Sequence, residues 1–101
     1  LGCDAVAFGS ADYFSYIAGE LKDFFDRTYY PSRGMVVGKP YAAFATGGGG
    51  GDIALDVLDR LCGSFKLSKS AFGVSAQGAP SSEVLAKCRE TGKKLAEIAL
   101  K

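Results

Sequence analysis

Residues 4–27 read DAVAFGSADYFSYIAGELKDFFDR and place a short apolar run, a polar and aromatic loop and an amphipathic segment one after another. The apolar run, residues 5–8, predicts a buried strand that ends at Gly9. The next residues have the spacing of one helix face, formed by the apolar Ile17, Leu21, Phe24 and Phe25 together with Thr28. A buried strand, a loop at its carboxyl end and a covering helix form the unit on which open α/β sheets place their ligands.

The middle of the chain repeats this order. Pro31 and Gly34 predict the end of the first helix, and residues 35–37 form either an edge segment or the lead-in to the next strand. Residues 41–45 (Tyr-Ala-Ala-Phe-Ala) predict a second buried strand, parallel to the first because a helix connects the two. Five glycines follow at residues 47–51.

The second half predicts two more helices and one more strand. Asp52 is the expected N-cap of a helix whose apolar pattern includes residues from Ile53 to Phe65 and whose end is expected near Gly63 and Ser64. A third strand is expected at residues 70–75, with a possible start at Leu67. The last helix carries its apolar stripe from Val84 to Ala99 and has Ser81 or Ser82 as its N-cap. Gly92 lies within that helix, and we expect it to mark close packing against the sheet. The order β-α-β-α-β-α predicts a layered α/β fold.

Composition limits the function classes. With 101 residues the chain is long enough for one domain, and 48% hydrophobic with 23% charged residues is ordinary for a globular protein. A formal net charge of +1, with the charges scattered, provides no field that would recruit nucleic acid or an anionic membrane. No apolar run is long enough for a transmembrane helix. The absence of histidine excludes the Ser-His-Asp and Cys-His hydrolases.

The three cysteines, Cys3, Cys62 and Cys88, are odd in number and widely spaced. This spacing fits neither a disulfide framework nor a zinc site, and no histidine is present to complete a metal site. Cys62 and Cys88 lie on the apolar faces of the predicted helices, where a free thiol behaves as a small hydrophobe. Free thiols of this kind predict a reducing, cytoplasmic location.

Two loops at the carboxyl edge of the sheet are the candidate ligand site. The first contains Tyr13, Phe14 and Tyr16, whose rings suit a planar ligand, although Phe14 is equally compatible with a place in the core. The second is the glycine run, in which each ordered glycine costs about 0.5–1 kcal/mol more in backbone entropy than alanine would. Such a run indicates close approach to a ligand, the alternative being a flexible surface loop. Neither a dinucleotide fingerprint nor a phosphate-binding P-loop is present.

The sequence GSADYFSYIAGELKDFFDRT, residues 9–28, resembles the signature of the flavodoxin-like FMN proteins. The most similar branch contains the NAD(P)H:quinone oxidoreductases and NADPH-dependent FMN reductases. Residues 38–40 (Gly-Lys-Pro), the strand after them and Thr46 with its glycines resemble the second flavin loop of the same family. The resemblance implies FMN as cofactor. The residues themselves offer no metal site and no side chain that is an obvious acid or base. The positions that correspond to flavin-contacting residues are Ser10, Ala11, Asp12, Tyr13, Phe14, Ser15, Thr46, Gly47, Gly48, Gly49 and Gly50.

The chain departs from this family in three respects. Ala11 stands where the family usually has proline, and Ser15 replaces a glycine near the reactive flavin edge. The larger departure is that the family begins with a strand, a phosphate loop, a helix and a further strand and helix. With the strand order 2-1-3-4-5, residues 1–101 supply strands 3, 4 and 5 of a three-layer sheet. They are expected to form a partial domain that lacks the phosphate-loop half.

Residues 5–8 then form an exposed strand edge where the central strand of the family belongs, and such an edge invites pairing with another chain. The expected partner is a second copy of the chain or the other half supplied by another segment. The resemblance implies an FMN-binding, NAD(P)H-dependent flavin or quinone oxidoreductase that uses NAD(P)H and a quinone or other acceptor. The alternatives are an electron carrier of the flavodoxin type and a cofactor-free half-domain that serves as an assembly module.

Overall fold

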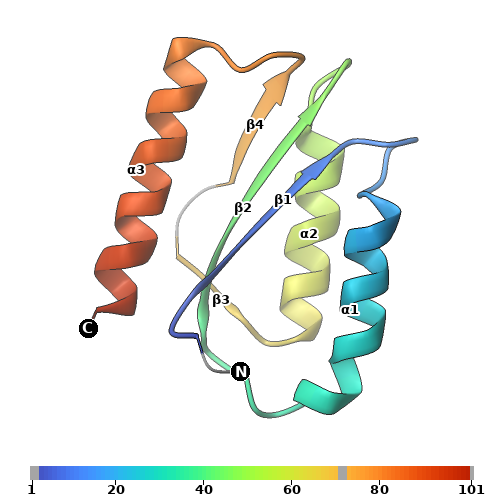
Figure 1. Cartoon of the computed structure of the whole chain (residues 1–101), viewed down its shortest axis with the longest axis vertical. Helices are drawn as coiled ribbons and strands as arrows, with labels where there is room; N and C mark the ends of the chain where they lie inside the picture. The colour runs from blue at the N-terminus through green and yellow to red at the C-terminus, as the bar shows by residue number, and fades with distance from the viewer. Residues whose placement is uncertain (1–2, 71–72, 101) are drawn as a thin grey trace.

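The computed structural model describes residues 3–70 and 73–100, which form a parallel sheet with helices on both of its faces (Figure 1). The elements in chain order are β1 (Val6–Ala11), α1 (Gly19–Ser32), β2 (Pro40–Gly47), α2 (Asp52–Ser64), β3 (Ser68–Lys69), β4 (Val74–Gln77) and α3 (Ser82–Ala99). This order confirms the predicted α/β fold.

The central strand of the sheet is β2. All of β1 pairs with it in parallel, from Val6 opposite Tyr41 to Ala11 opposite Thr46. On its other side β2 pairs in parallel with β3 near Pro40 and with β4 from Phe44 onward. The first two strands are therefore parallel, as predicted. Among the described strands, β1 pairs with β2 alone and forms one edge of the sheet.

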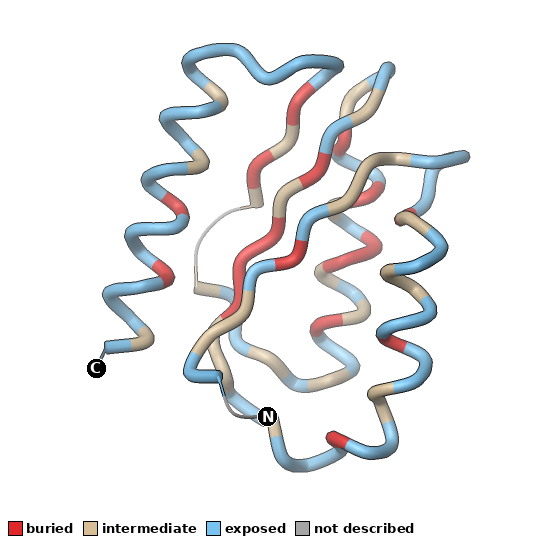
Figure 2. Tube along the Cα trace, viewed as in Figure 1, coloured by how far each residue is buried: buried red, intermediate tan, exposed pale blue. Residues whose placement is uncertain are grey.

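Helices α1 and α2 cover one face of the sheet, and α3 covers the other, over β2 and β4 (Figure 1). Buried residues concentrate on β2 and on the inner side of α2 (Figure 2). Alternation along β2 directs Tyr41, Ala43 and Ala45 into this core, where Leu58 and Cys62 of α2 are fully buried.

Helix α1 attaches to the sheet through aromatic side chains. The ring of Phe25 lies 5.0 Å from that of Phe8 on β1 and 5.5 Å from that of Phe65 at the end of α2, centroid to centroid. Pro31 lies inside the last turn, and the helix ends one residue later. Residues 35–37, for which an edge segment and a lead-in were both open, form a turn.

The predicted third strand is replaced by two short ones. β3 and β4 pair with different parts of β2, and residues 71–72 lie outside the described residues. Ser70 lies between them and bonds to Tyr41 instead, its N–H and hydroxyl both donating to the Tyr41 carbonyl at 3.0 and 2.8 Å. The apolar pattern thus located this region correctly and missed the interruption.

Of the two predicted N-cap residues, one is correct. Ser81 is the N-cap of α3, and its hydroxyl accepts a hydrogen bond from the Val84 N–H at 3.2 Å. The N-cap of α2 is Gly51, so the prediction of Asp52 was wrong. Asp52 is the first helical residue, and its carboxylate accepts a 2.6 Å hydrogen bond from the Ser75 hydroxyl on β4. None of the helices in the described part of the chain is long and apolar enough to cross a membrane.

Gly92 does not mark close packing. It is exposed, and a Cβ built on it meets no atom within 4 Å. The residues of α3 that are buried against the sheet are Thr91 and Leu95 instead. Gly92→Ala should therefore raise the free energy of unfolding by about 1 kcal/mol, the helix-propensity difference. Urea denaturation of both proteins measures it, and an unchanged or lower midpoint would contradict the exposed position.

The burial of Cys62 predicts that the stability of the fold depends on pH. Burial, aided by the Asp59 carboxylate, raises the pKa of its thiol from 9.0 to about 12. Above pH 9 the unfolded chain loses this proton and the folded chain retains it, so stability should fall with rising pH. The slope should approach about 1.4 kcal/mol per pH unit. Urea denaturation at pH 9 and 10 measures the slope. Cys62→Val should flatten it, and an unchanged slope in that variant would refute the assignment.

Candidate functional site

The loops after β1 and β2 meet at the carboxyl edge of the sheet. The Asp12 N–H donates to the Thr46 carbonyl at 2.7 Å, which holds the first loop against the start of the glycine run. Between the loops lies a hollow of about 460 Å³, within the range of small-molecule sites. Its lining residues are Asp12, Ser15, Gly48, Gly49, Gly50, Asp52 and Ile53.

The first loop is a tight two-residue turn with an unfavourable backbone. Tyr13 and Tyr16 exchange two backbone hydrogen bonds of 3.0 Å, and Phe14 and Ser15 between them have φ values of 52° and 59°. A turn with two left-handed central residues normally uses asparagine and glycine. For other residues the left-handed conformation costs roughly 1–2 kcal/mol each. Strained residues of this kind cluster at active sites and ligand-binding segments, where the surrounding structure maintains the strain.

The aromatic residues of this loop do not have the same role. Phe14 is 103% exposed, so the possibility that it belongs to the core is excluded, whereas Ile17 is 3% exposed and does belong to it. Tyr13 is 57% exposed. The side chains of Tyr13 and Phe14 are accessible to a ligand, but neither lines the hollow.

The Ser10 hydroxyl makes its hydrogen bonds within the fold. It accepts a hydrogen bond from the Ala18 N–H at 2.9 Å and donates one to the Ala11 carbonyl at 2.7 Å. The bond from Ala18 ties the end of β1 to the start of α1 and so holds together the two ends of the loop between them. The effect of Ser10 on the site is thus to position the loop.

Three of the five glycines are required by the chain itself. Added Cβ atoms on Gly47 and Gly51 would overlap the backbone of Gly50 and Ala45 respectively, and Gly50 has a φ of 107° that favours glycine. Gly48 and Gly49 differ, because a Cβ on either would enter open space. Nothing in the described fold requires glycine at these two positions, which lie on the hollow.

The hollow has an acidic lining and no basic one. Two carboxylates, those of Asp12 and Asp52, line it, and no lysine or arginine does. Such a site does not attract a phosphate group, because the carboxylates repel it. Bare backbone at Gly48 and Gly49 and a strained turn opposite fit a flat, uncharged ring. Within the described residues, no group of three potential ligand side chains could hold a metal ion.

The structure brings together five of the predicted residues: Asp12, Ser15, Gly48, Gly49 and Gly50. Ser10, Ala11, Thr46 and Gly47 lie in the strand ends that carry the loops. Asp52 and Ile53 line the hollow although the sequence did not single them out as ligand contacts. Their signal was their position directly after the glycine run, at the first turn of α2.

Comparison with solved structures shows the same fold. A flavodoxin from the domain Archaea superposes with a TM-score of 0.81 at 22% identity, covering 97% of this chain and 66% of that one. A flavodoxin, WrbA-like protein from Agrobacterium tumefaciens gives a TM-score of 0.80 at 21% identity, with 97% and 67% covered. The chain thus spans about two thirds of the length of each of these structures.

The sequence matches the family described as NADPH-dependent FMN reductase over residues 1–77. That span includes both loops of the hollow and ends with β4. No curated protein is similar enough in sequence to be matched. The match covers more than half of the chain and agrees with the fold, so the chain belongs to the NADPH-dependent FMN reductase family, whose cofactor is FMN.

Proposed function

We propose that the chain holds the flavin ring of an NAD(P)H-dependent flavin or quinone oxidoreductase. The observation that carries this proposal is the hollow itself, where a strained turn faces two glycines that the fold does not require. Bound FMN would supply the hydride and electron-transfer chemistry, and the protein would supply orientation and electrostatics. NAD(P)H and a quinone or other acceptor would be the substrates.

In this proposal the chain contributes backbone more than side chains. The turn at Phe14 and Ser15 contributes amide and carbonyl groups on one side of the ring. Gly48 and Gly49 let the second loop approach the ring without side chains between. Asp12 places a carboxylate beside the ring, where charge and hydrogen bonding set how readily a flavin accepts electrons.

The phosphate of FMN would be held by a second segment, which we propose packs beside β1. The acidic lining of the hollow supports this division, as does the length of the similar structures, of which about a third has no counterpart here. With the strand order 2-1-3-4-5, that segment would supply the strand next to β1. Residues 1–101 would then be one part of a flavodoxin-like domain.

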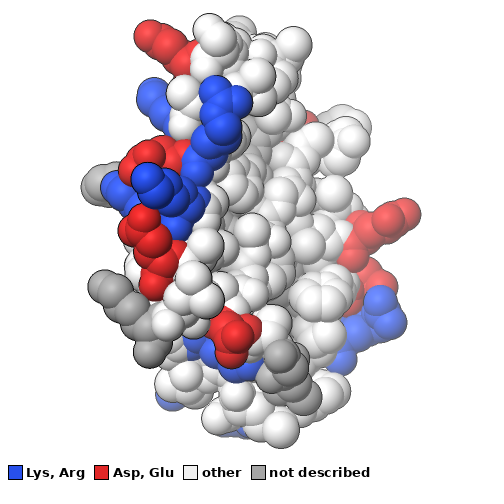
Figure 3. Space-filling view, turned by 60° about the vertical axis from the view of Figure 1, so that its left-hand side comes forward, with Lys and Arg blue, Asp and Glu red and all other residues white. Residues whose placement is uncertain are grey.

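The edge of β1 is suited to such pairing. Because Asp12 bonds to β2 and pairing groups alternate along a strand, Ala7 and Gly9 direct their amide and carbonyl groups away from β2. Both are exposed, and a Cβ on Gly9 would come no closer than 4.0 Å to another atom. Where no atom of the chain itself excludes a side chain, a glycine in a strand is typical of a place that another backbone approaches closely. The side of the molecule that carries α3 also has a broad surface without charged residues (Figure 3).

The division of the site predicts how the chain treats different flavins. In a fluorescence titration, the fluorescence of each flavin should be quenched on binding. Riboflavin, which lacks the phosphate, should bind with an affinity at least equal to that of FMN. Tyr13→Ala should weaken the binding of both flavins by removing an exposed aromatic ring of the first loop, with the unfolding midpoint unchanged. Absence of flavin binding would refute the ring site and favour a cofactor-free assembly module. Tighter binding of FMN would refute the proposed division while retaining the ring site.

A second measurement separates an oxidoreductase from an electron carrier. The flavin-loaded chain, mixed with NADPH or NADH and a quinone, should oxidise the nicotinamide, which is followed by its absorbance. A flavin-loaded protein that oxidises neither nucleotide would be a carrier. The same assay with Tyr13→Ala at saturating flavin distinguishes a lost cofactor from a lost reaction.

A further inference from the structure

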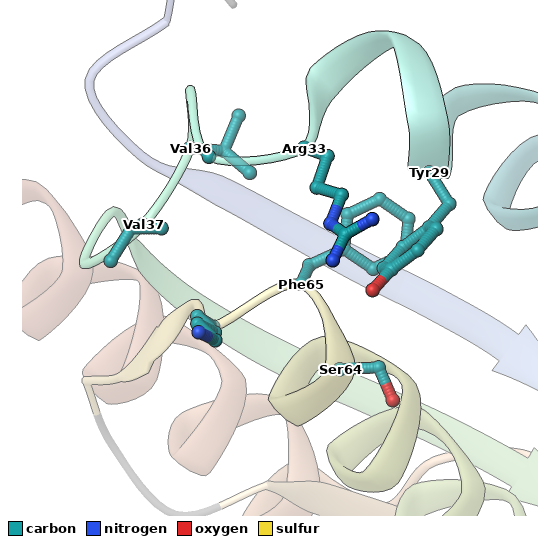
Figure 4. Close-up of a pocket in the computed structure, with 8 residues that line it drawn as sticks. Tyr29, Arg33, Val36, Val37, Ser64 and Phe65 are labelled. Atoms are coloured by element: carbon teal, nitrogen blue, oxygen red, sulfur yellow. The ribbon is translucent and has the colours of Figure 1, made fainter.

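A separate pocket of about 160 Å³ lies at the other end of the sheet (Figure 4). The turn before β2 and the turn before β3 form it, so it is at the amino ends of the strands, whereas the hollow is at their carboxyl ends. The eight residues of β2 separate the two by roughly 23 Å. The pocket therefore belongs to no part of the proposed flavin site.

One wall of the pocket is apolar and the other is cationic. Tyr29 and Phe65, whose ring centroids lie 5.2 Å apart, form the apolar wall together with Val36 and Val37. The Arg33 guanidinium is turned toward these rings (Figure 4), and Lys66 lines the same pocket. No carboxylate lines it.

Arg33 and Lys66 are exposed, and several polar groups around the pocket have no protein partner within the described residues. In residues 3–70 and 73–100, neither the Arg33 guanidinium nor the Lys66 ammonium makes a hydrogen bond or ion pair. In the same part of the chain, the backbone N–H groups of Gly34, Val36 and Val37 have no acceptor. Two cations and three N–H donors around one pocket are the chemistry that binds a phosphate group.

Lys66 occupies a position where the fold favours glycine. Its N–H donates to the Gly63 carbonyl and that of Leu67 to the Cys62 carbonyl, the bond pattern that ends a helix with a left-handed residue. The φ of Lys66 is 60°, and glycine is the usual residue at this point. The lysine that lines the pocket therefore has a backbone conformation that glycine would adopt with less strain.

We propose that this pocket binds an organic phosphomonoester, with the phosphate between Arg33 and Lys66 and the organic group on the rings of Tyr29 and Phe65. A doubly charged oxyanion matches two cations, and the apolar wall matches a ligand with an apolar or aromatic group beside the phosphate. Free phosphate would use the cations alone. An organic phosphomonoester and free phosphate are thus distinguished by whether contact with the apolar wall increases the affinity.

Phenyl phosphate is the probe, and inorganic phosphate and sodium chloride at matched ionic strength are the comparisons. In two-dimensional NMR titrations of the intact chain, phenyl phosphate should saturably shift the amide signals of Gly34, Val36 and Val37. Inorganic phosphate should bind more weakly, and chloride should not give saturable shifts. Equal affinity for both phosphates would overturn the monoester assignment, and equal shifts with chloride would overturn the site.

Lys66→Gly provides a test that a structural role cannot imitate. This variant should lower the affinity for phenyl phosphate about tenfold while its melting temperature stays equal or rises, because strain is relieved. Arg33→Gln should lower affinity similarly. Lys94→Gln, which removes an exposed charge on α3, is the matched control and should bind as the parent does. Unchanged affinity in Lys66→Gly would overturn the proposal.

Discussion

Gly51→Ala is expected to lower the free energy of unfolding by about 3 kcal/mol, the upper part of the range for overpacked sites. Gly51 is buried, and an added Cβ would lie 2.7 Å from both the carbonyl carbon and the oxygen of Ala45. Those atoms belong to β2, the central strand, which pairs with β1 and β4 at this point and cannot shift without disturbing both. The loss is large against a typical domain stability of roughly 5–15 kcal/mol.

Urea denaturation followed by circular dichroism measures the loss. Gly48→Ala is the matched control, because its Cβ enters open space and should change stability by less than about 0.5 kcal/mol. Equal losses in the two variants would contradict the distinction between glycines that the fold requires and glycines that it does not.

Gly49→Val is expected to have the opposite profile, a loss of flavin binding without a loss of stability. Gly49 lines the hollow, and a side chain there would enter the space proposed for the ring. The valine side chain would overlap a bound ring, and such overpacking costs about 1.4 kcal/mol or more. This cost corresponds to at least a tenfold fall in affinity for the flavin. The chain's own atoms are not overlapped, so the unfolding midpoint should stay near that of the parent.

Titration with riboflavin measures this effect independently of the phosphate site. Gly63→Val is the control, since Gly63 also has open space around it but lies at the far end of α2, away from the hollow. If Gly49→Val and the parent bind riboflavin equally, the ring does not lie against the second loop. The proposed placement would then be wrong.

Periodicity in the sequence was sufficient to predict the main elements. The apolar stripes located α1, α2 and α3, and the short apolar runs located β1 and β2 and their parallel pairing. These patterns are reliable because each element must bury one face, and burial fixes the spacing of apolar residues. Loop signals also succeeded where the chemistry is local, as for Ser81, whose hydroxyl caps the helix that begins one residue later.

Properties that depend on distant atoms were not predictable from the pattern. The pattern led us to expect close packing at Gly92, and only the position of α3 relative to the sheet shows that this residue faces open space. Phe14 fits the apolar pattern of a core residue, but the Tyr13–Tyr16 turn directs it into solvent. The third strand is divided because β3 and β4 pair with separate parts of β2.

The candidate site shows the same division between local and distant causes. The sequence by itself determined that two loops follow parallel strands, and therefore that they meet at one edge of the sheet. It also showed that the five consecutive glycines at residues 47–51 need an explanation, either in the fold or in a bound ligand. Only the tertiary structure decided which glycine has which reason. The overlap of a Cβ at Gly51 depends on how closely the start of α2 lies to Ala45 on β2, and the free space at Gly48 and Gly49 depends on what packs around them.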